Sequence, residues 1–311
     1  VRSRPWTSRC RCGTPGWPIG SALAFAGGGS LLGYFESGSP AVLGGIEAWR
    51  ATFLIVGAAG VVIAMLMMLL PEPRRRQGQF SKAERNEEAM ASTGEFLVYL
   101  RRASFFLVPL IIAVTMLNMF ANGFMTWIAP LFERRFGWAT PAVGAALGPT
   151  VLITGLVGAP LGAWLIATVG RWRRQDGAVT VLALVSGLML PLAALSPLAA
   201  SGVAAVAGIS FVLTMAAVGG VAAPAAVVNS APPAMRARVF AVYLVIANLL
   251  GSGGGALVYA LSTDYLFGDA TKLHLSMATV SAALLALALL LLMVADGRYH
   301  RVMRLSGEAP Q

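Results

Sequence analysis

The chain has 311 residues, of which 57% are hydrophobic and 12% are charged, with a formal net charge of +10. This composition excludes a water-soluble enzyme or binding module, because soluble domains contain about 25% charged residues, and it excludes a disordered chain. It also excludes an outer-membrane β-barrel, whose strands alternate apolar and polar residues. The predicted fold class is an all-α membrane protein.

Long stretches without Asp, Glu, Lys or Arg locate the membrane helices. Because a membrane-spanning helix needs about 20 apolar residues, the longest of these stretches, residues 177–235, must hold two spans that fold back near 196–202. The first stretch is rich in Gly and Ser, and the last is almost entirely Leu and Ala. We predict about eight transmembrane helices, at residues 16–35, 51–70, 105–132, 142–169, 178–196, 201–222, 239–262 and 275–295.

Basic residues indicate the orientation. Of the 23 Lys and Arg, 19 lie before the first span, after the even-numbered spans and in the tail, and 4 lie in the other connections. Since Lys and Arg in short loops mark the cytoplasmic face, we predict a multi-pass protein of the cytoplasmic (inner or plasma) membrane with both termini cytoplasmic. This distribution explains the positive charge as topology, so no nucleic-acid partner is expected.

The longest connection, residues 71–102, has mixed charges and few bulky apolar residues before Phe96. It is interpreted as a cytoplasmic central loop, a solvated linker with a surface helix. The predicted organisation is an atypical N-terminal stretch (1–15), two helices (16–70), this loop (71–102), a six-helix bundle (103–296) and a cytoplasmic tail (297–311).

Three sequence motifs occur around these spans: Trp49–Gly57 leading to Pro71-Glu72-Pro73, Gly158–Gly162 leading to Gly170–Arg174, and Met235–Arg238 leading through Asn248–Gly251 to Ser262–Gly268. Together with helix order, loop lengths and charges, they resemble the major facilitator superfamily of transporters over residues 16–303. The third motif resembles its spinster-like branch. The second resembles the family's signature loop, but Ala167 and Thr168 stand where the family has an acid followed by a base.

The resemblance implies that the first two spans are the family's fifth and sixth helices, so a fragment lacking the first four is expected. It implies transport of a small amphipathic or hydrophobic solute by alternating access between two bundles, and by analogy a lipid-like substrate. The expected partners are this small-molecule or lipid-like substrate, membrane lipids and a further chain over the open half. The alternative is a non-transporting membrane scaffold or a pseudotransporter fragment.

Polar residues within spans are costly in hydrocarbon and usually face a partner or a cavity. Thr115, Asn118 and Asn122 share one helical face. Either they form interhelical hydrogen bonds, or they line the transport cavity, where the family places polar groups of its seventh helix. Tyr243 either lines the same cavity or is an interfacial aromatic anchor. The candidates for the substrate cavity are Thr115, Asn118, Asn122, Trp127, Tyr243 and Asn248.

Glycines at four-residue spacing allow helices to approach closely in lipid. Such positions serve either helix packing alone or the rocking of helices during alternating access, and composition does not separate the two. The candidates for gating or helix packing are Gly144, Gly148, Gly158, Gly162, Gly170, Arg171, Gly251 and Gly253.

Catalysis is not expected. Ser210 lies in a predicted span, but both histidines, His274 and His300, lie outside the spans, so no base can activate it. Asp264 lies at a helix end without a second acid inside a span, which argues against a paired-carboxylate protease. Cys10 and Cys12 have no nearby His or further Cys and are interpreted as free thiols. No phosphate-binding loop is present, and no metal or cofactor is expected.

The acidic residues give a prediction about coupling. All 13 Asp and Glu lie in loops, at helix ends or in the tails. Proton carriers in pumps are acids or histidines within the membrane. We therefore expect no solute uptake by this chain alone under an imposed pH gradient.

Overall fold

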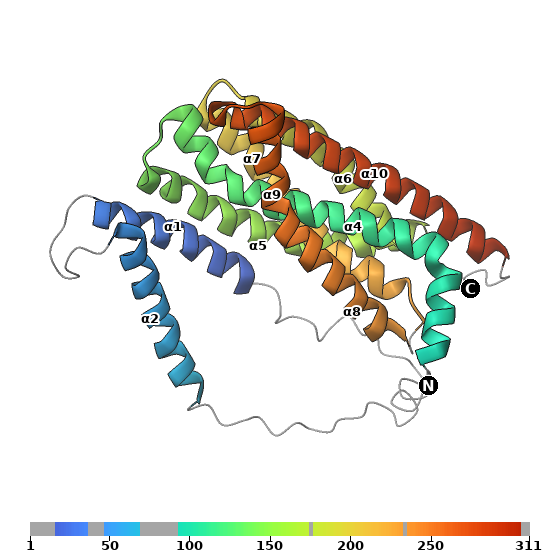
Figure 1. The fold of residues 1–311 in the computed structure, drawn as a ribbon. Coiled ribbons are helices and arrows are strands. Elements are labelled where there is room, and N and C mark those ends of the chain that lie inside the picture. Colours follow the sequence, from blue (N-terminus) through green and yellow to red (C-terminus); the bar gives the residue numbers. More distant parts are fainter. Residues whose placement is uncertain (1–15, 37–46, 69–92, 174–176, 233–234, 306–311) are drawn as a thin grey trace.

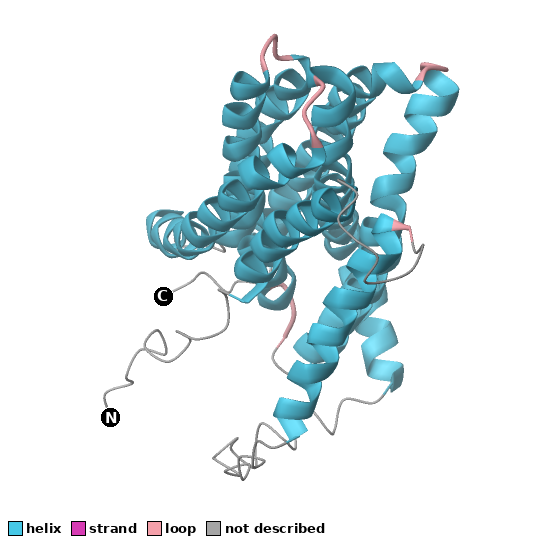
Figure 2. Ribbon diagram, turned by 90° about the vertical axis from the view of Figure 1, so that its left-hand side faces the viewer, coloured by secondary structure: helices cyan, strands magenta, loops and turns pink. Residues whose placement is uncertain are grey.

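The structure is a computed structural model that describes residues 16–36, 47–68, 93–173, 177–232 and 235–305. The described residues are mostly helical, with no strand among them (Figures 1 and 2). The predicted all-α fold is therefore confirmed. The helices are α1 Gly16–Glu36, α2 Ala48–Met68, α4 Thr93–Phe136, α5 Thr140–Arg173, α6 Gly177–Leu195, α7 Gly202–Asn229, α8 Arg236–Ile246, α9 Gly253–Leu261 and α10 Leu273–Leu305.

Seven helical stretches of the described residues are long and apolar enough to cross a membrane. The sequence predicted about eight. Residues 16–36 do form a helix, α1, which is rich in glycine and is not among the seven. The spanning stretches are Trp49–Met68, Ala103–Phe136, Thr140–Trp172, Gly177–Leu198, Gly202–Asn229, Arg236–Leu266 and Ala270–Gly297.

The longest charge-free stretch divides as predicted. α6 ends at Leu195, the short 3₁₀ helix η2 (Ser196–Leu198) turns the chain, and α7 begins at Gly202. Ser201 caps α7, because its hydroxyl accepts a hydrogen bond from the amide of Ala204 at 3.3 Å. Between α4 and α5, Gly137 ends α4 with a φ of 66°, a conformation that favours glycine.

The helices α4 and α10 extend furthest beyond the predicted apolar spans. α4 begins at Thr93, ten residues before Ala103, so the end of the predicted central loop is helical. Tertiary contacts hold this extension: the Tyr99 hydroxyl donates to the Ser230 carbonyl at 3.2 Å, and Arg238 lies 5.8 Å from the ring centre of Phe96. Burial raises the pKa of Tyr99. At the other end of the chain, α10 continues to Leu305, past the predicted boundary of the tail.

The predicted seventh span is a continuous helical stretch with two irregular segments. Between α8 and α9 the chain forms the π-helical segment η4 (Ala247–Ser252), and after α9 it forms a second, η5 (Ser262–Leu266). The 3₁₀ helix η6 (Ala270–Lys272) then leads into α10. Such segments widen the helix locally and are frequent at functional sites.

The helices α4 to α10 pack as one bundle around a shared hydrophobic core. Glycines bring two pairs of helices into backbone contact. A Cβ atom placed on Gly158 of α5 would lie 2.6 Å from the Thr214 carbonyl oxygen of α7, and one on Gly255 of α9 would lie 2.6 Å from the Met119 oxygen of α4. These close approaches maximise van der Waals contact between helices, which is the main attraction available in lipid.

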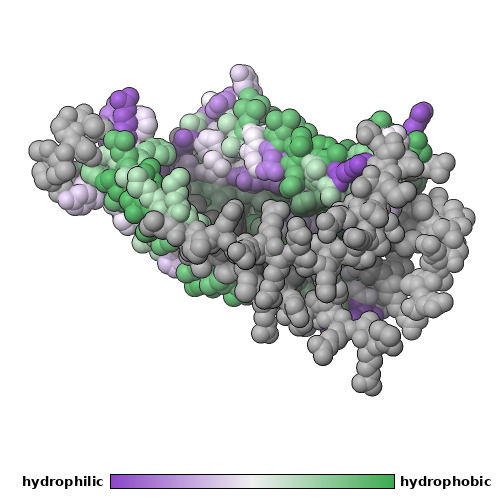
Figure 3. All heavy atoms as spheres, turned by 90° about the horizontal axis from the view of Figure 1, so that it is seen from below, coloured by the Kyte–Doolittle hydropathy of each residue, from purple (hydrophilic) through white to green (hydrophobic). Residues whose placement is uncertain are grey.

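The first two helices lie beside this bundle (Figure 1). α1 packs against α5, where a Cβ on Gly29 would lie 3.2 Å from the Gly144 Cα atom. α2 packs on α1 and leaves most of its apolar side chains exposed, such as Phe53 and Met68. Figure 3 shows hydrophobic side chains along the described surface of these helices.

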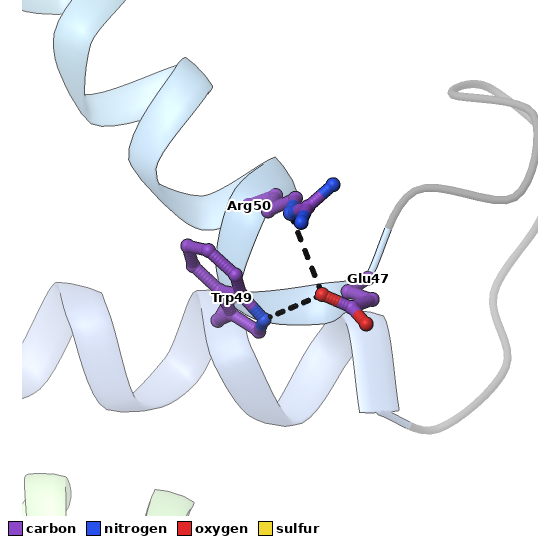
Figure 4. Close-up of polar contacts among 3 residues, drawn as sticks. All are labelled: Glu47, Trp49 and Arg50. Carbon is purple, nitrogen blue, oxygen red and sulfur yellow. Dashed lines mark hydrogen bonds and ion pairs between the residues drawn. The ribbon is translucent and has the colours of Figure 1, made fainter.

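The start of α2 is ordered by one carboxylate (Figure 4). Glu47 accepts a hydrogen bond from the Trp49 indole nitrogen at 2.8 Å and forms an ion pair with the Arg50 guanidinium at 3.4 Å. Arg50 also lies over the Trp49 ring, 5.1 Å from its centre. These polar and aromatic groups are typical of a helix end at the membrane interface.

The remaining predicted features at the ends and in the middle of the chain fall outside the described residues. They are residues 1–15 with Cys10 and Cys12, most of the central loop (71–92) and the last residues of the tail (306–311).

Candidate functional site

A cavity of about 480 Å³ lies between α4, α5, α6, α7 and α8. This volume suits a small organic molecule. Most of its lining is apolar, and none of the described residues that line it carries a charge. The lining residues are Val114, Leu117, Asn118, Phe120, Ala121, Asn122, Met125, Val151, Thr154, Gly155, Ala159, Val185, Met189, Leu213, Ala216, Ala217, Gly219, Gly220, Val221, Ala223 and Tyr243.

Small residues on α5 and α7 create the space. Gly155 and Ala159 face the cavity from α5, and Ala216, Gly219 and Gly220 face it from α7. A Cβ atom placed on Gly220 would meet no atom within 4 Å, so the cavity is open beside it. The small residues on these two neighbouring helices therefore leave room that larger side chains would fill.

Four polar side chains interrupt the apolar lining: Asn118, Asn122, Thr154 and Tyr243. The Thr154 hydroxyl is used within its own helix, because it donates to the Thr150 carbonyl at 2.8 Å. The Tyr243 ring packs against Phe240, with 5.6 Å between ring centres. The two asparagines are thus the main polar surface on the α4 side of the cavity.

Asn118 and Asn122 lie one turn apart and are bonded to each other. The Asn122 side-chain nitrogen donates to the Asn118 carbonyl at 3.0 Å and also to the Asn118 side-chain oxygen. Gly251 of η4 packs directly on Asn118, since a Cβ there would lie 2.9 Å from the Asn118 Cβ and Cγ atoms. The absence of a side chain at Gly251 therefore makes room for this amide.

Three other predicted cavity residues do not line the cavity. Thr115 is buried, and its hydroxyl donates to the Ile111 carbonyl at 2.7 Å. The Trp127 indole donates to the Ala256 carbonyl of α9 at 3.0 Å, which ties α4 to α9. Asn248 donates to the Leu244 carbonyl of its own helix at 2.8 Å. The predicted set thus divides into Asn118, Asn122 and Tyr243 in the lining and these three outside it.

The predicted glycines lie mostly at helix contacts. Gly144 and Gly148 are buried in α5, and Cβ atoms on Gly158 and Gly162 would meet α7, the latter 3.1 Å from the Val218 Cα atom. Gly170 of α5 lies against the first residue of α6, because a Cβ atom placed on Gly177 would lie 2.6 Å from the Gly170 nitrogen.

Two members of the predicted gating set make few contacts. A Cβ atom placed on Gly253 would meet no atom within 4 Å, so this position is open. At Gly251, two residues earlier, a Cβ atom would collide with Asn118. Arg171 is exposed at the end of α5, where its guanidinium donates to the Ala167 carbonyl at 3.1 Å.

Several lining residues were not predicted from the sequence. Val151, Val185, Met189 and Leu213 are apolar residues of apolar helices, and nothing local distinguishes them from side chains that face lipid or core. The Gly219-Gly220 pair is the one local signal, because two adjacent glycines in a long span leave a gap on the helix surface.

The described residues contain no group of three or more His, Cys, Asp or Glu side chains that could hold a metal ion. Ser210 donates to the Val206 carbonyl at 2.6 Å, so its hydroxyl is bonded within its own helix. These observations give no support to a hydrolytic or metal-dependent site within the described bundle.

Comparison with known proteins gives one family and one described fold relative. The family model of the Major Facilitator Superfamily matches residues 14–256. The fold is similar to the crystal structure of a bacterial homolog of the human lysosomal transporter Spinster, in an inward-facing and unoccupied conformation. The TM-score is 0.60 at 19% identity, over 92% of this chain and 68% of that chain. No curated protein matches the sequence.

Proposed function

Because this chain belongs to the Major Facilitator Superfamily of membrane transporters, we propose that its cavity holds a small amphipathic or hydrophobic solute during transport by alternating access. The observation that carries this proposal is the cavity of about 480 Å³, apolar except for a few polar groups and without a charged lining residue among those described. A concave, mostly apolar space with a few convergent polar groups is the usual form of a small-molecule site.

The lining favours neutral or apolar solutes for a physical reason. An ion that enters the cavity loses hydration, and the described lining offers no opposite charge to compensate for it. Apolar surface gains about 25 cal/mol per Å² on leaving water. The bound solute therefore gains most of its affinity from contact with the apolar wall, while the two asparagines orient it.

The glycine contacts supply surfaces on which helices can move. α1 meets α5 at Gly29 and Gly144, and α5 meets α7 at Gly158 and Gly162. At these glycines no side chains interdigitate between the helices, so one helix can shift along the other with few steric clashes. In the proposed cycle these contacts allow the bundle to change its opening.

The test is solute exchange in proteoliposomes with the full chain. The proteoliposomes are loaded with a panel of unlabelled neutral amphiphiles. These trapped solutes should accelerate the entry of a labelled member of the same panel. Asn118→Leu should slow this exchange, because it removes an amide from the cavity wall. Asn248→Leu is the matched control and should not, because Asn248 lies outside the lining. Absence of exchange for every solute would contradict the proposal and favour a scaffold role.

The orientation is proposed from the basic residues and has its own test. In a chain with Cys10 and Cys12 replaced by Ser, single cysteines are introduced as Trp172→Cys and Ala200→Cys, both at exposed positions at opposite ends of spans. The side that carries most of the Lys and Arg, which includes Trp172 at the end of α5, is expected to be cytoplasmic. An impermeant thiol reagent should therefore label Ala200→Cys in intact cells and leave Trp172→Cys unlabelled. The reverse pattern would invert the topology.

A further inference from the structure

The hydrogen bonds of the asparagine pair fix the orientation of both amides. A backbone carbonyl oxygen only accepts hydrogen bonds, so the Asn122 atom 3.0 Å from the Asn118 carbonyl must be the donor NH₂ group. The Asn118 side-chain atom that faces the same NH₂ group must then be the acceptor oxygen. The usual ambiguity between the O and N atoms of an amide is therefore resolved here by the backbone.

This arrangement leaves one donor and one acceptor group available. The NH₂ group of Asn118 and the side-chain oxygen of Asn122 have no hydrogen bond to another described residue. Each belongs to the same carboxamide as an atom already bonded in the pair. The two groups are thus neighbours, and both residues line the cavity.

Gly251 holds the donor in place. Because Gly251 has no side chain, the Asn118 Cβ, Cγ and side-chain oxygen pack directly against its backbone. A Cβ atom placed on Gly251 would lie 3.1 Å from that oxygen. The segment η4 therefore restricts the Asn118 rotamer from the opposite helix. A restricted amide loses less conformational entropy on binding than a free one.

From this geometry we infer that the solute is an uncharged amphiphile whose head group carries a donor and an acceptor together, as a primary carboxamide does. The inference rests on the proposed transport function. The head-group oxygen accepts from Asn118, its N–H donates to Asn122, and an apolar tail contacts side chains such as Val114, Val151 and Leu213. A carboxylate head offers two acceptors, so it lacks the donor for Asn122 and also brings an uncompensated charge.

The test is binding of a matched probe series to the full chain in lipid nanodiscs. The probes are decanamide, which has the donor and the acceptor, N,N-dimethyldecanamide, which keeps only the acceptor, and decanoate, which is charged. Binding to empty nanodiscs is subtracted. Since one hydrogen bond changes affinity by roughly tenfold or less, decanamide should bind about five- to tenfold more tightly than its dimethyl analogue, and decanoate should bind most weakly.

Variants separate the asparagine pair from the rest of the cavity. The double variant Asn118→Leu with Asn122→Leu should abolish the preference for decanamide over the dimethyl analogue. Asn248→Leu, which changes an asparagine outside the lining, should keep that preference. Thermal unfolding of each variant in the same nanodiscs checks that the fold is intact.

The outcomes distinguish this inference from the transport proposal. Equal binding of the two amides, or tightest binding of decanoate, would overturn the assignment of the head group while exchange in proteoliposomes could still stand. A preference that survives the double variant would also overturn it. If no probe binds above the empty nanodiscs and no solute is exchanged, both proposals fail together.

Discussion

The helices α2 and α4 have similar apolar character but very different surroundings. Only 6% of the most apolar stretch of α2 is buried, against 50% for α4. In α4 the buried side chains include large aromatics such as Phe120 and Phe124, packed in the shared core. Among the α2 side chains that the structure describes, only the small Ala51 is almost fully buried, at 2% exposure. Hydrophobicity thus places a helix in the membrane, while side-chain size and glycine position decide whether it packs.

The largest expected effect comes from filling a glycine contact in the bundle. Gly255→Val should destabilise the fold, because its Cβ would lie 2.6 Å from the Met119 carbonyl oxygen and 3.0 Å from the Gly123 nitrogen. Overpacking against backbone costs about 1–3 kcal/mol or more. Thermal unfolding in detergent should show a clear fall in Tm.

The matched control is Gly57→Val in α2, where a Cβ meets no atom within 4 Å. This variant should unfold at the same temperature as the parent chain. Equal losses of Tm for the two variants would contradict the difference between the bundle and α2.

A smaller effect is expected from filling the cavity itself. Gly220→Leu adds a side chain where the structure leaves open space in the lining. It should lower decanamide affinity by about tenfold or more, because the added volume displaces the solute, and it should leave Tm nearly unchanged. Gly60→Leu in α2, where a Cβ is equally unobstructed, should change neither quantity. Unchanged binding with Gly220→Leu would place the solute elsewhere.

The smallest effect concerns a hydrogen bond between α9 and α10. The hydroxyls of Tyr259 and Ser281 lie 2.9 Å apart, both buried. Tyr259→Phe, Ser281→Ala and the double variant form a cycle whose coupling energy should be about 0.5–1 kcal/mol, as for other hydrogen bonds between membrane helices. A coupling energy of zero would mean that this pair of hydroxyls does not stabilise the contact between α9 and α10.

The sequence predicted the helical class and the fold-back near Ser196 because both depend on local hydrophobicity and turn residues. It also placed Asn118 and Asn122 on one face, since four residues make about one turn. It could not show which polar residues of α4 reach the cavity. Thr115 shares that face, yet its neighbours bury it and its hydroxyl bonds to its own helix.

The cavity wall was also beyond local prediction. Val185 of α6 and Leu213 of α7 come together only when their helices pack, and their own surroundings in the sequence are uniformly apolar. The early start of α4 has the same cause, because Tyr99 and Phe96 are held by residues more than a hundred positions away.

The central claim is that solute binds in the cavity of the bundle, and cysteine accessibility tests it most directly. In a chain with Cys10 and Cys12 replaced by Ser, Met125→Cys places a thiol in the lining and Leu257→Cys places one at an exposed position outside it. A small water-soluble thiol reagent should modify Met125→Cys in nanodiscs faster than Leu257→Cys. Decanamide should slow the modification of Met125→Cys and leave the rate at Leu257→Cys unchanged. Equal modification at the two positions, or a rate at Met125→Cys that no neutral amphiphile alters, would contradict it.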